Sequence, residues 1–174
     1  ISPSIHGEEP SGPVYRNLDY VDVDRCTAAI EEGGKDIWGV AINAALACTG
    51  DNDPREIMER ARVIAERTDR PILYGVRREP SDWLLAEQLE LLRSGDVVTY
   101  CFQGEDQSIV EGGKIVQPVW EARERGVLFD IGHGMTSFDF RVAETAIADG
   151  FIPDTISTDQ YSRHVASKPQ HDLP

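Results

Sequence analysis

The chain has 174 residues, of which 40% are hydrophobic and 28% charged, a composition that suits one folded domain with a substantial core. Its 31 acidic residues outnumber 17 basic ones, giving a net charge of -14, which argues against nucleic acid or an anionic membrane as main partner. The acidity fits a cytoplasmic enzyme or subunit. No apolar run approaches the length of a membrane span. The three cysteines lack CxxC spacing and favour reduced thiols.

Apolar residues recur at strand or helix spacing along most of the chain. After a short apolar start at residues 1–5 and a Gly- and Pro-rich loop, the predicted strands cover 37–42, 71–76, 96–102, 127–131 and 155–158. The predicted helices cover 21–32, a segment starting at Asp53, a segment capped by Ser81 and ended by Gly95, 116–125 and 138–149. The segments 43–52 and 103–115 are predicted loops.

Two of these helices have side chains that define their starts and buried faces. Asp53 is a predicted N-cap, with Pro54 in the first turn and Glu56 placed for a capping box. The inward stripe of this helix comprises Ile57, Ala61, Ile64 and Ala65. The inward residues of the helix after Ser81 are Leu84, Leu85, Leu89 and Leu92.

Strands and helices alternate, and the strand starts are roughly 25–35 residues apart, as in βαβ units. The fold class is therefore α/β, with about six parallel strands when residues 1–5 are counted as one of them. Two architectures fit this order: an open doubly wound sheet, or part of a (β/α)8 barrel of the TIM type. No GxGxxG or P-loop pattern follows a strand, which weakens a nucleotide-binding interpretation.

Polar residues at the carboxyl ends of the predicted strands are the candidate site, because α/β proteins place their chemistry there. In chain order they are Asn43, Arg77, Tyr100, Gln103, His133 and Asp159. Asp159 is either a general base or metal ligand, or it has a structural role as a loop cap for the Tyr161–Arg163 turn or in an ion pair with Arg163. His133 either faces the site or binds loop carbonyls. One histidine and one aspartate are too few for a closed metal site.

Three phrases of the sequence resemble the amidohydrolase superfamily, in its dihydroorotase-like branch that includes deacetylases: SGDVVTYCFQG, GVLFDIGHGMTSFDFRVAETAIADGF and PDTISTD. The resemblance runs along nearly the whole chain. It implies a (β/α)8 barrel in which residues 1–174 form a single partial domain covering about strands 3 to 8. The first two strands, with the HxH pair that the family carries there, are then expected outside this chain.

The resemblance also implies that most metal ligands have been replaced. Ala41 stands where the family has a carboxylated lysine, Asn43 where it has an arginine, and Gly75, Tyr100 and Gln103 where it has histidines. His133 and the catalytic aspartate, Asp159, are kept. Alanine and glycine side chains have no donor atoms, so we expect no metal and no other cofactor, with zinc possible only if missing segments supply ligands.

Two functional hypotheses follow from this pattern. The first is a hydrolase of a small amide, ester or cyclic imide without the usual binuclear metal site, in which Asp159 is the base and His133 its partner. Asn43, Arg77, Tyr100 and Gln103 then bind the small-molecule substrate. The second is a non-catalytic homologue that serves as a binding or structural subunit. In either case, open strand edges favour a homo-oligomer or association with the missing barrel segments.

Overall fold

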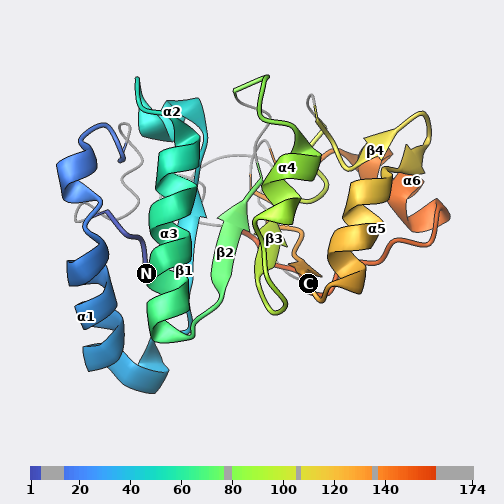
Figure 1. The fold of residues 1–174 in the computed structure, drawn as a ribbon. Helices are drawn as coiled ribbons and strands as arrows, with labels where there is room; N and C mark the ends of the chain where they lie inside the picture. Colours follow the sequence, from blue (N-terminus) through green and yellow to red (C-terminus); the bar gives the residue numbers. More distant parts are fainter. Residues whose placement is uncertain (5–13, 77–79, 105–106, 135–136, 160–174) are drawn as a thin grey trace, which may run out of the picture. The chain divides into compact units, whose positions relative to one another are not determined.

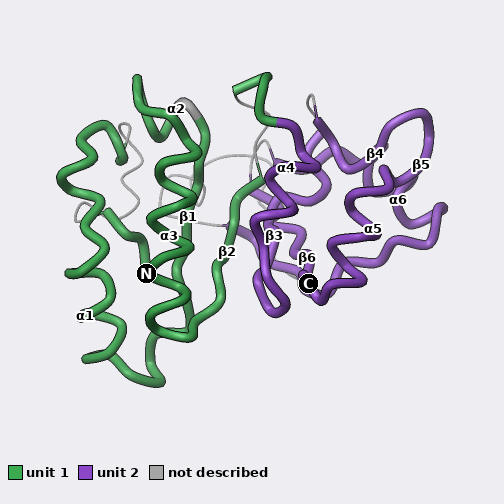
Figure 2. Tube along the Cα trace, in the orientation of Figure 1, with its two compact units in different colours: residues 1–83 green, residues 84–174 purple. Residues whose placement is uncertain are grey.

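The computed structural model describes residues 1–4, 14–76, 80–104, 107–134 and 137–159. The chain divides into two compact units, residues 1–83 and residues 84–174, coloured separately in Figure 2. None of the helices within the described ranges is long and apolar enough to cross a membrane.

Unit 1 contains a pair of parallel strands with helices packed beside them (Figure 1). Strand β1 (Val40–Asn43) runs parallel to β2 (Ile72–Gly75), with Asn43 opposite Gly75 at their carboxyl ends. Helix α3 (Pro54–Thr68) contacts both strands and α1 (Val23–Gly33). The remaining elements are the 3-10 turns η1 (Leu18–Tyr20) and η2 (Gly34–Asp36) and the short helix α2 (Leu46–Thr49).

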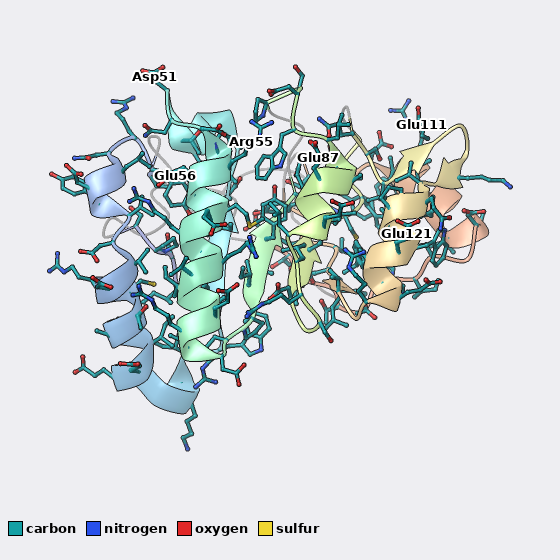
Figure 3. The ribbon with its side chains drawn as sticks, viewed as in Figure 1. Asp51, Arg55, Glu56, Glu87, Glu111 and Glu121 are labelled. Atoms are coloured by element: carbon teal, nitrogen blue, oxygen red, sulfur yellow. The ribbon has the colours of Figure 1, made fainter. Side chains whose placement is uncertain are left out.

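Helix α3 begins as predicted and buries the predicted stripe. The Asp53 carboxylate accepts a hydrogen bond from the Arg55 N–H, and Pro54 occupies the first turn. Ile57, Ala61, Ile64 and Ala65 are all fully buried. Instead of the expected capping box, the Glu56 carboxylate forms an ion pair with Arg60, whose Nε donates to Glu56 Oε1 at 2.9 Å. Figure 3 shows Arg55 and Glu56 at the start of this helix.

Two predictions for unit 1 were wrong in detail. The strand expected from residue 37 begins only at Val40, whose N–H donates to the Pro71 carbonyl at 2.9 Å, and a side chain at Gly39 would collide with the same carbonyl. Trp38, expected to be covered, is 54% exposed. The predicted loop 43–52 contains helix α2.

Unit 2 also contains a parallel strand pair. Strand β3 (Val97–Thr99) pairs with β6 (Leu128–Phe129), and Asp130 forms one further parallel bridge with Thr155, where a longer strand was predicted. The helices of this unit are α4 (Leu85–Glu90), α5 (Gln117–Glu124) and α6 (Phe140–Ala148). Helices α5 and α6 lie within their predicted ranges. Figure 3 labels Glu121, a side chain of α5.

Two features of unit 2 differ from the sequence-based expectations. The predicted loop after β3 contains an antiparallel hairpin, β4 (Val110–Glu111) and β5 (Lys114–Ile115), joined by two glycines. Helix α4 starts after Leu84 instead of near Ser81, and the Glu87 carboxylate accepts from the Leu84 N–H. Leu84 is 55% exposed, because it precedes the helix and does not share its inward face.

An aromatic cluster forms the centre of the core of unit 2. Phe151 is fully buried, and its ring meets those of Phe102, Trp120 and Phe129 edge to face, with centroid distances of 5.2–6.5 Å. The Arg123 guanidinium lies 5.0 Å from the centre of the same ring. The cluster joins the segment after α6 to β6 and α5.

We expect Phe151→Ala to lower the free energy of unfolding by about 3–5 kcal/mol, because it leaves a cavity among packed rings. The control is Phe140→Ala on α6, whose ring is 71% exposed and meets Phe138 edge to face, so its loss should cost at most about 1.5 kcal/mol. Urea unfolding monitored by circular dichroism measures both. Equal losses from the two variants would contradict this account of the core.

Candidate functional site

The residues of the candidate site in unit 2 lie where β3 and β6 end. Tyr100 directly follows β3, and its hydroxyl donates a hydrogen bond to Asp159 Oδ2 at 3.2 Å. Both residues have left-handed backbone conformations, with φ of 65° at Tyr100 and 49° at Asp159. Such conformations are strained in non-glycine residues and concentrate at functional sites. The structure therefore brings together two residues predicted from widely separated parts of the sequence.

His133 lies in the Gly-His-Gly loop after β6, and its ring is fixed from two sides. Its Nδ1 lies 2.9 Å from the Gly134 carbonyl oxygen, which can only accept. The neutral ring therefore carries its proton on Nδ1, which leaves Nε2 as the nitrogen able to accept a proton or hydrogen bond. The ring also stacks on Phe138, with centroids 4.5 Å apart and an interplanar angle of 17°.

Gly134 brings this loop against the aspartate. Its φ is 46°, and a Cβ atom added at this position would lie 3.2 Å from Asp159 Oδ2. Any larger residue at this position would press on the carboxylate. The backbone continues the contact, since the His133 N–H donates to the Ser157 carbonyl at 2.8 Å and the Gly134 N–H to the Thr158 carbonyl at 2.9 Å.

Asp130 is a residue of this region that the sequence reasoning missed. Its carboxylate is buried, with only 5% of the residue exposed, and it accepts hydrogen bonds from three hydroxyl groups. The donors are Thr99 at 2.8 Å, Thr155 at 2.7 Å and Ser157 at 2.6 Å. The alternation of hydroxyls at 155 and 157 was the available signal, because residues two apart in an extended segment share one face.

Two of the other predicted site residues, Gln103 and Asn43, lie within the described part of the chain. Gln103 is buried, its N–H donates to the Tyr100 carbonyl at 3.1 Å, and its own carbonyl accepts from the Ser108 hydroxyl. Asn43 ends β1 in unit 1, opposite Gly75. Arg77 lies outside the described residues.

Cys101 follows Tyr100 and is fully buried. Burial raises the pKa of its thiol, and the nearby Asp130 charge raises it further. A thiol that resists deprotonation is a poor nucleophile, so Cys101 belongs to the core. All three cysteines are free, as expected.

The metal ligands of the resembled family do not fit the residues present here. Ala41 and Gly75 offer no side-chain donor, and the Tyr100 hydroxyl is hydrogen-bonded to Asp159. Within the described ranges, no three or more His, Cys, Asp or Glu side chains gather in a way that could hold a metal ion.

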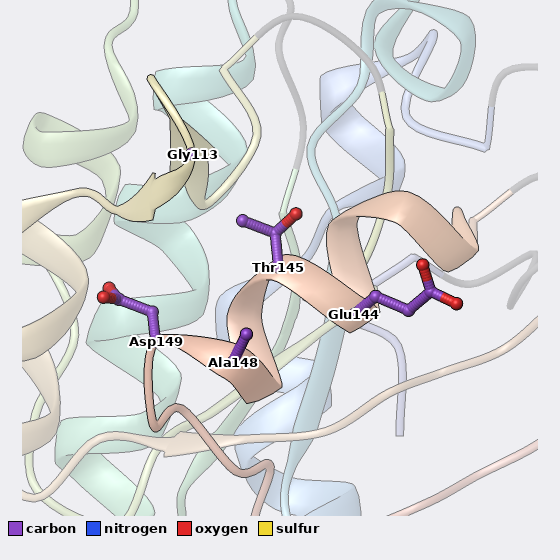
Figure 4. A pocket seen from close by; sticks show the side chains of 5 residues that line it. All are labelled: Gly113, Glu144, Thr145, Ala148 and Asp149. Carbon is purple, nitrogen blue, oxygen red and sulfur yellow. The ribbon is translucent and has the colours of Figure 1, made fainter.

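The pocket shown in Figure 4 does not contain the candidate site. It is lined by Gly113, Glu144, Thr145, Ala148 and Asp149. The Asp149 carboxylate accepts from the Ile115 N–H at 2.9 Å and so fastens the β4–β5 hairpin to the end of α6. The pocket therefore lies where the hairpin meets the end of α6. None of the residues that line it was predicted as a site residue.

Comparisons with known proteins place this geometry in context. No family model matches the chain. A deacetylase of Enterococcus faecalis is 34% identical over 159 residues, covering 90% of this chain and 42% of the relative. A deacetylase of Agrobacterium fabrum is 35% identical over 162 residues, covering 92% of this chain and 39% of the relative.

Two solved structures are similar along most of the chain. A crystal structure of an adenine deaminase matches with a TM-score of 0.77 and 34% identity, over 85% of this chain and 40% of that one. A dihydroorotase matches with a TM-score of 0.73 and 36% identity, over 86% and 38%. The chain has an amidohydrolase-like fold. It spans about 40% of the length of these relatives, and the prediction of an α/β fold that forms part of a TIM-type barrel is confirmed.

We expect Gly134→Ala to destabilise the protein more than Gly150→Ala does. Both glycines have positive φ, so each alanine variant carries the cost of a left-handed residue, about 1–2 kcal/mol. A Cβ at Gly150 meets nothing within 4 Å, whereas one at Gly134 presses on Asp159. Thermal unfolding compares the two, and equal losses would mean that the loop does not bear on the carboxylate.

The start of α6, just after this loop, has a pH-dependent cap. The Asp139 carboxylate accepts from the Arg141 side chain at 2.7 Å and from the Arg141 N–H at 2.7 Å, and these bonds lower its pKa from 3.8 to about 2. A depressed pKa in the folded state means that the cap contributes stability above pH 3.8, and that this contribution is lost as the pH falls towards 2.

Asp139→Asn should therefore weaken the dependence of stability on pH over that interval, because asparagine still caps the helix but does not titrate. Urea midpoints measured at several pH values for the wild type and the variant test this. Parallel curves for the two proteins would contradict the assignment.

Proposed function

We propose that the protein is a hydrolase of a small amide-type substrate in which Asp159 is the general base and no binuclear metal site assists it. The observation that supports this most directly is the Tyr100–Asp159 hydrogen bond. The residue that replaces a metal-binding histidine of the resembled family donates to the retained aspartate. A hydroxyl donor thus contacts the carboxylate that the family places beside a metal.

The reaction that these groups support is a general-base hydrolysis. Asp159 takes a proton from water while the water oxygen attacks the substrate carbonyl carbon, and the same carboxyl group then returns the proton to the leaving nitrogen. His133, whose ring is held by the Gly134 carbonyl at Nδ1, contacts the substrate and orients it. Similarity to deacetylases supports an acyl group on nitrogen as the substrate bond.

Several predictions from the sequence remain part of this proposal. Asn43, Arg77 and Gln103 are proposed substrate contacts. A small-molecule substrate, a cytoplasmic location, a homo-oligomer or association with further barrel segments, and the absence of a cofactor belong to the same proposal. The described residues offer too few metal donors for the family's usual chemistry, which favours a second candidate, a subunit that binds without catalysis.

We expect Asp159→Asn in the full-length protein to lower kcat/KM by about 10²–10⁴-fold, the usual contribution of a positioned base, with the thermal midpoint little changed. The assay uses para-nitrophenyl acetate and para-nitroacetanilide as chromogenic ester and amide. Glu144→Gln on α6, a carboxylate outside the site, is the matched control and should leave turnover unchanged.

Elemental analysis of the same preparation completes the experiment. Turnover without bound metal supports the proposal, whereas near-stoichiometric zinc in a binuclear site would refute its metal-free form. A wild-type protein that binds the probes but turns over neither would favour the binding subunit instead. Full turnover by the Asp159→Asn variant would refute Asp159 as the general base.

A further inference from the structure

Asp130 is a buried carboxylate whose side-chain partners are all neutral. Oδ2 accepts from the Thr99 and Ser157 hydroxyls and Oδ1 from the Thr155 hydroxyl, at 2.6–2.8 Å. These are ordinary distances for hydroxyl groups that donate to a carboxylate. A buried charge needs several such donors, so the three hydroxyls and the carboxylate depend on one another.

The three donors come from the segments that carry the candidate site. Thr99 is the last residue of β3 and directly precedes Tyr100. Thr155 and Ser157 lie on the segment that leads to Asp159. Asp130 itself directly follows β6 and precedes the His133 loop by two residues. One carboxylate therefore holds together the backbone around all three site residues.

The backbone bonds next to this cluster transmit its position. The Ser157 carbonyl accepts from the His133 N–H at 2.8 Å, and the Asp130 carbonyl accepts from the Cys101 N–H at 3.3 Å. Moving Ser157 would therefore move the His133 loop, and with it the Gly134 carbonyl that fixes the imidazole proton.

We propose that Asp130 is a positioning residue that sets the His133 ring and the Asp159 carboxylate in their working geometry through its three hydroxyl partners. The catalytic consequence rests on the proposed function, but the effect on the His133 ring does not. Asp130 therefore acts on the reaction through His133 and Asp159, without contacting the reacting atoms itself.

The first test reads the His133 ring directly, by nitrogen NMR of the imidazole in full-length protein, with the signal assigned by its loss in His133→Gln. The wild type should show the proton on Nδ1. Asp130→Asn and the milder Ser157→Ala should shift the ring towards a mixture of tautomers. Thr145→Val, which removes a hydroxyl bonded to the Arg141 carbonyl on α6, is the control and should change nothing.

Should Asp130→Asn fail to fold, Ser157→Ala decides the question, because it removes one donor and leaves the other two. A folded variant whose His133 spectrum matches the wild type would overturn the proposal.

The second test is kinetic and uses para-nitrophenyl acetate. We expect Ser157→Ala to lower kcat by about 10- to 100-fold with KM little changed, because misplacement of the reacting groups acts on the chemical step. In the Asp159→Asn background the same substitution should have no further effect on kcat. An additive effect there, or an unchanged kcat, would refute positioning through Asp159.

The two tests separate this inference from the proposed function. A wild-type protein without turnover would defeat the proposed function, while the NMR comparison would still decide whether Asp130 positions the His133 ring.

Discussion

The geometry of the candidate site depends on the requirement that the buried carboxylate of Asp130 be supplied with hydrogen-bond donors. Burying a charged group without partners costs several kcal/mol, and here the partners are Thr99, Thr155 and Ser157. Since Thr99 ends β3 whereas Thr155 and Ser157 lie on the segment that leads to Asp159, satisfying one carboxylate also fixes the position of both segments. Metal ions perform this task in many hydrolases by binding ligands from several strand ends. In this unit the Asp130 carboxylate and its three hydroxyl partners join the segments.

Backbone strain marks the same region. Tyr100 and Asp159 both have left-handed conformations and share a hydrogen bond, and the intervening Gly-His-Gly loop uses glycine at its two turning points. A side chain at Gly132 would collide with the Thr99 hydroxyl, and one at Gly134 would press on Asp159. Two left-handed residues and two close glycine approaches thus lie beside the retained histidine and aspartate.

The sequence predicted the parts of this fold in which burial repeats with a regular period. Helix α3 has a clear N-cap and an apolar stripe, and the paired strands are continuous apolar runs, so both were found. The β4–β5 hairpin was missed because its strands are two residues each and its Gly112-Gly113 turn is typical of any loop. The exposed Leu84 was misplaced because an apolar residue beside a helix start fits the periodic pattern by chance.

The site was predictable in its residue types but not in its connections. The strand-end rule selected Tyr100, His133 and Asp159, which the structure brings together, because it depends only on where apolar runs stop. The hydroxyl cluster around Asp130 depends on long-range pairing between residues 99, 130 and 157, which a single sequence does not encode visibly.

The left-handed Tyr100 also bears on protein engineering. Glycine adopts this backbone conformation without strain, so selection for heat resistance alone would favour glycine at this position wherever the lost packing of the half-buried Tyr100 ring costs less than the strain relieved. The same exchange would remove the hydroxyl that contacts Asp159. A library screened only for thermal tolerance would therefore enrich molecules that are easier to fold and have lost part of their chemistry, so such a screen needs a functional assay beside it.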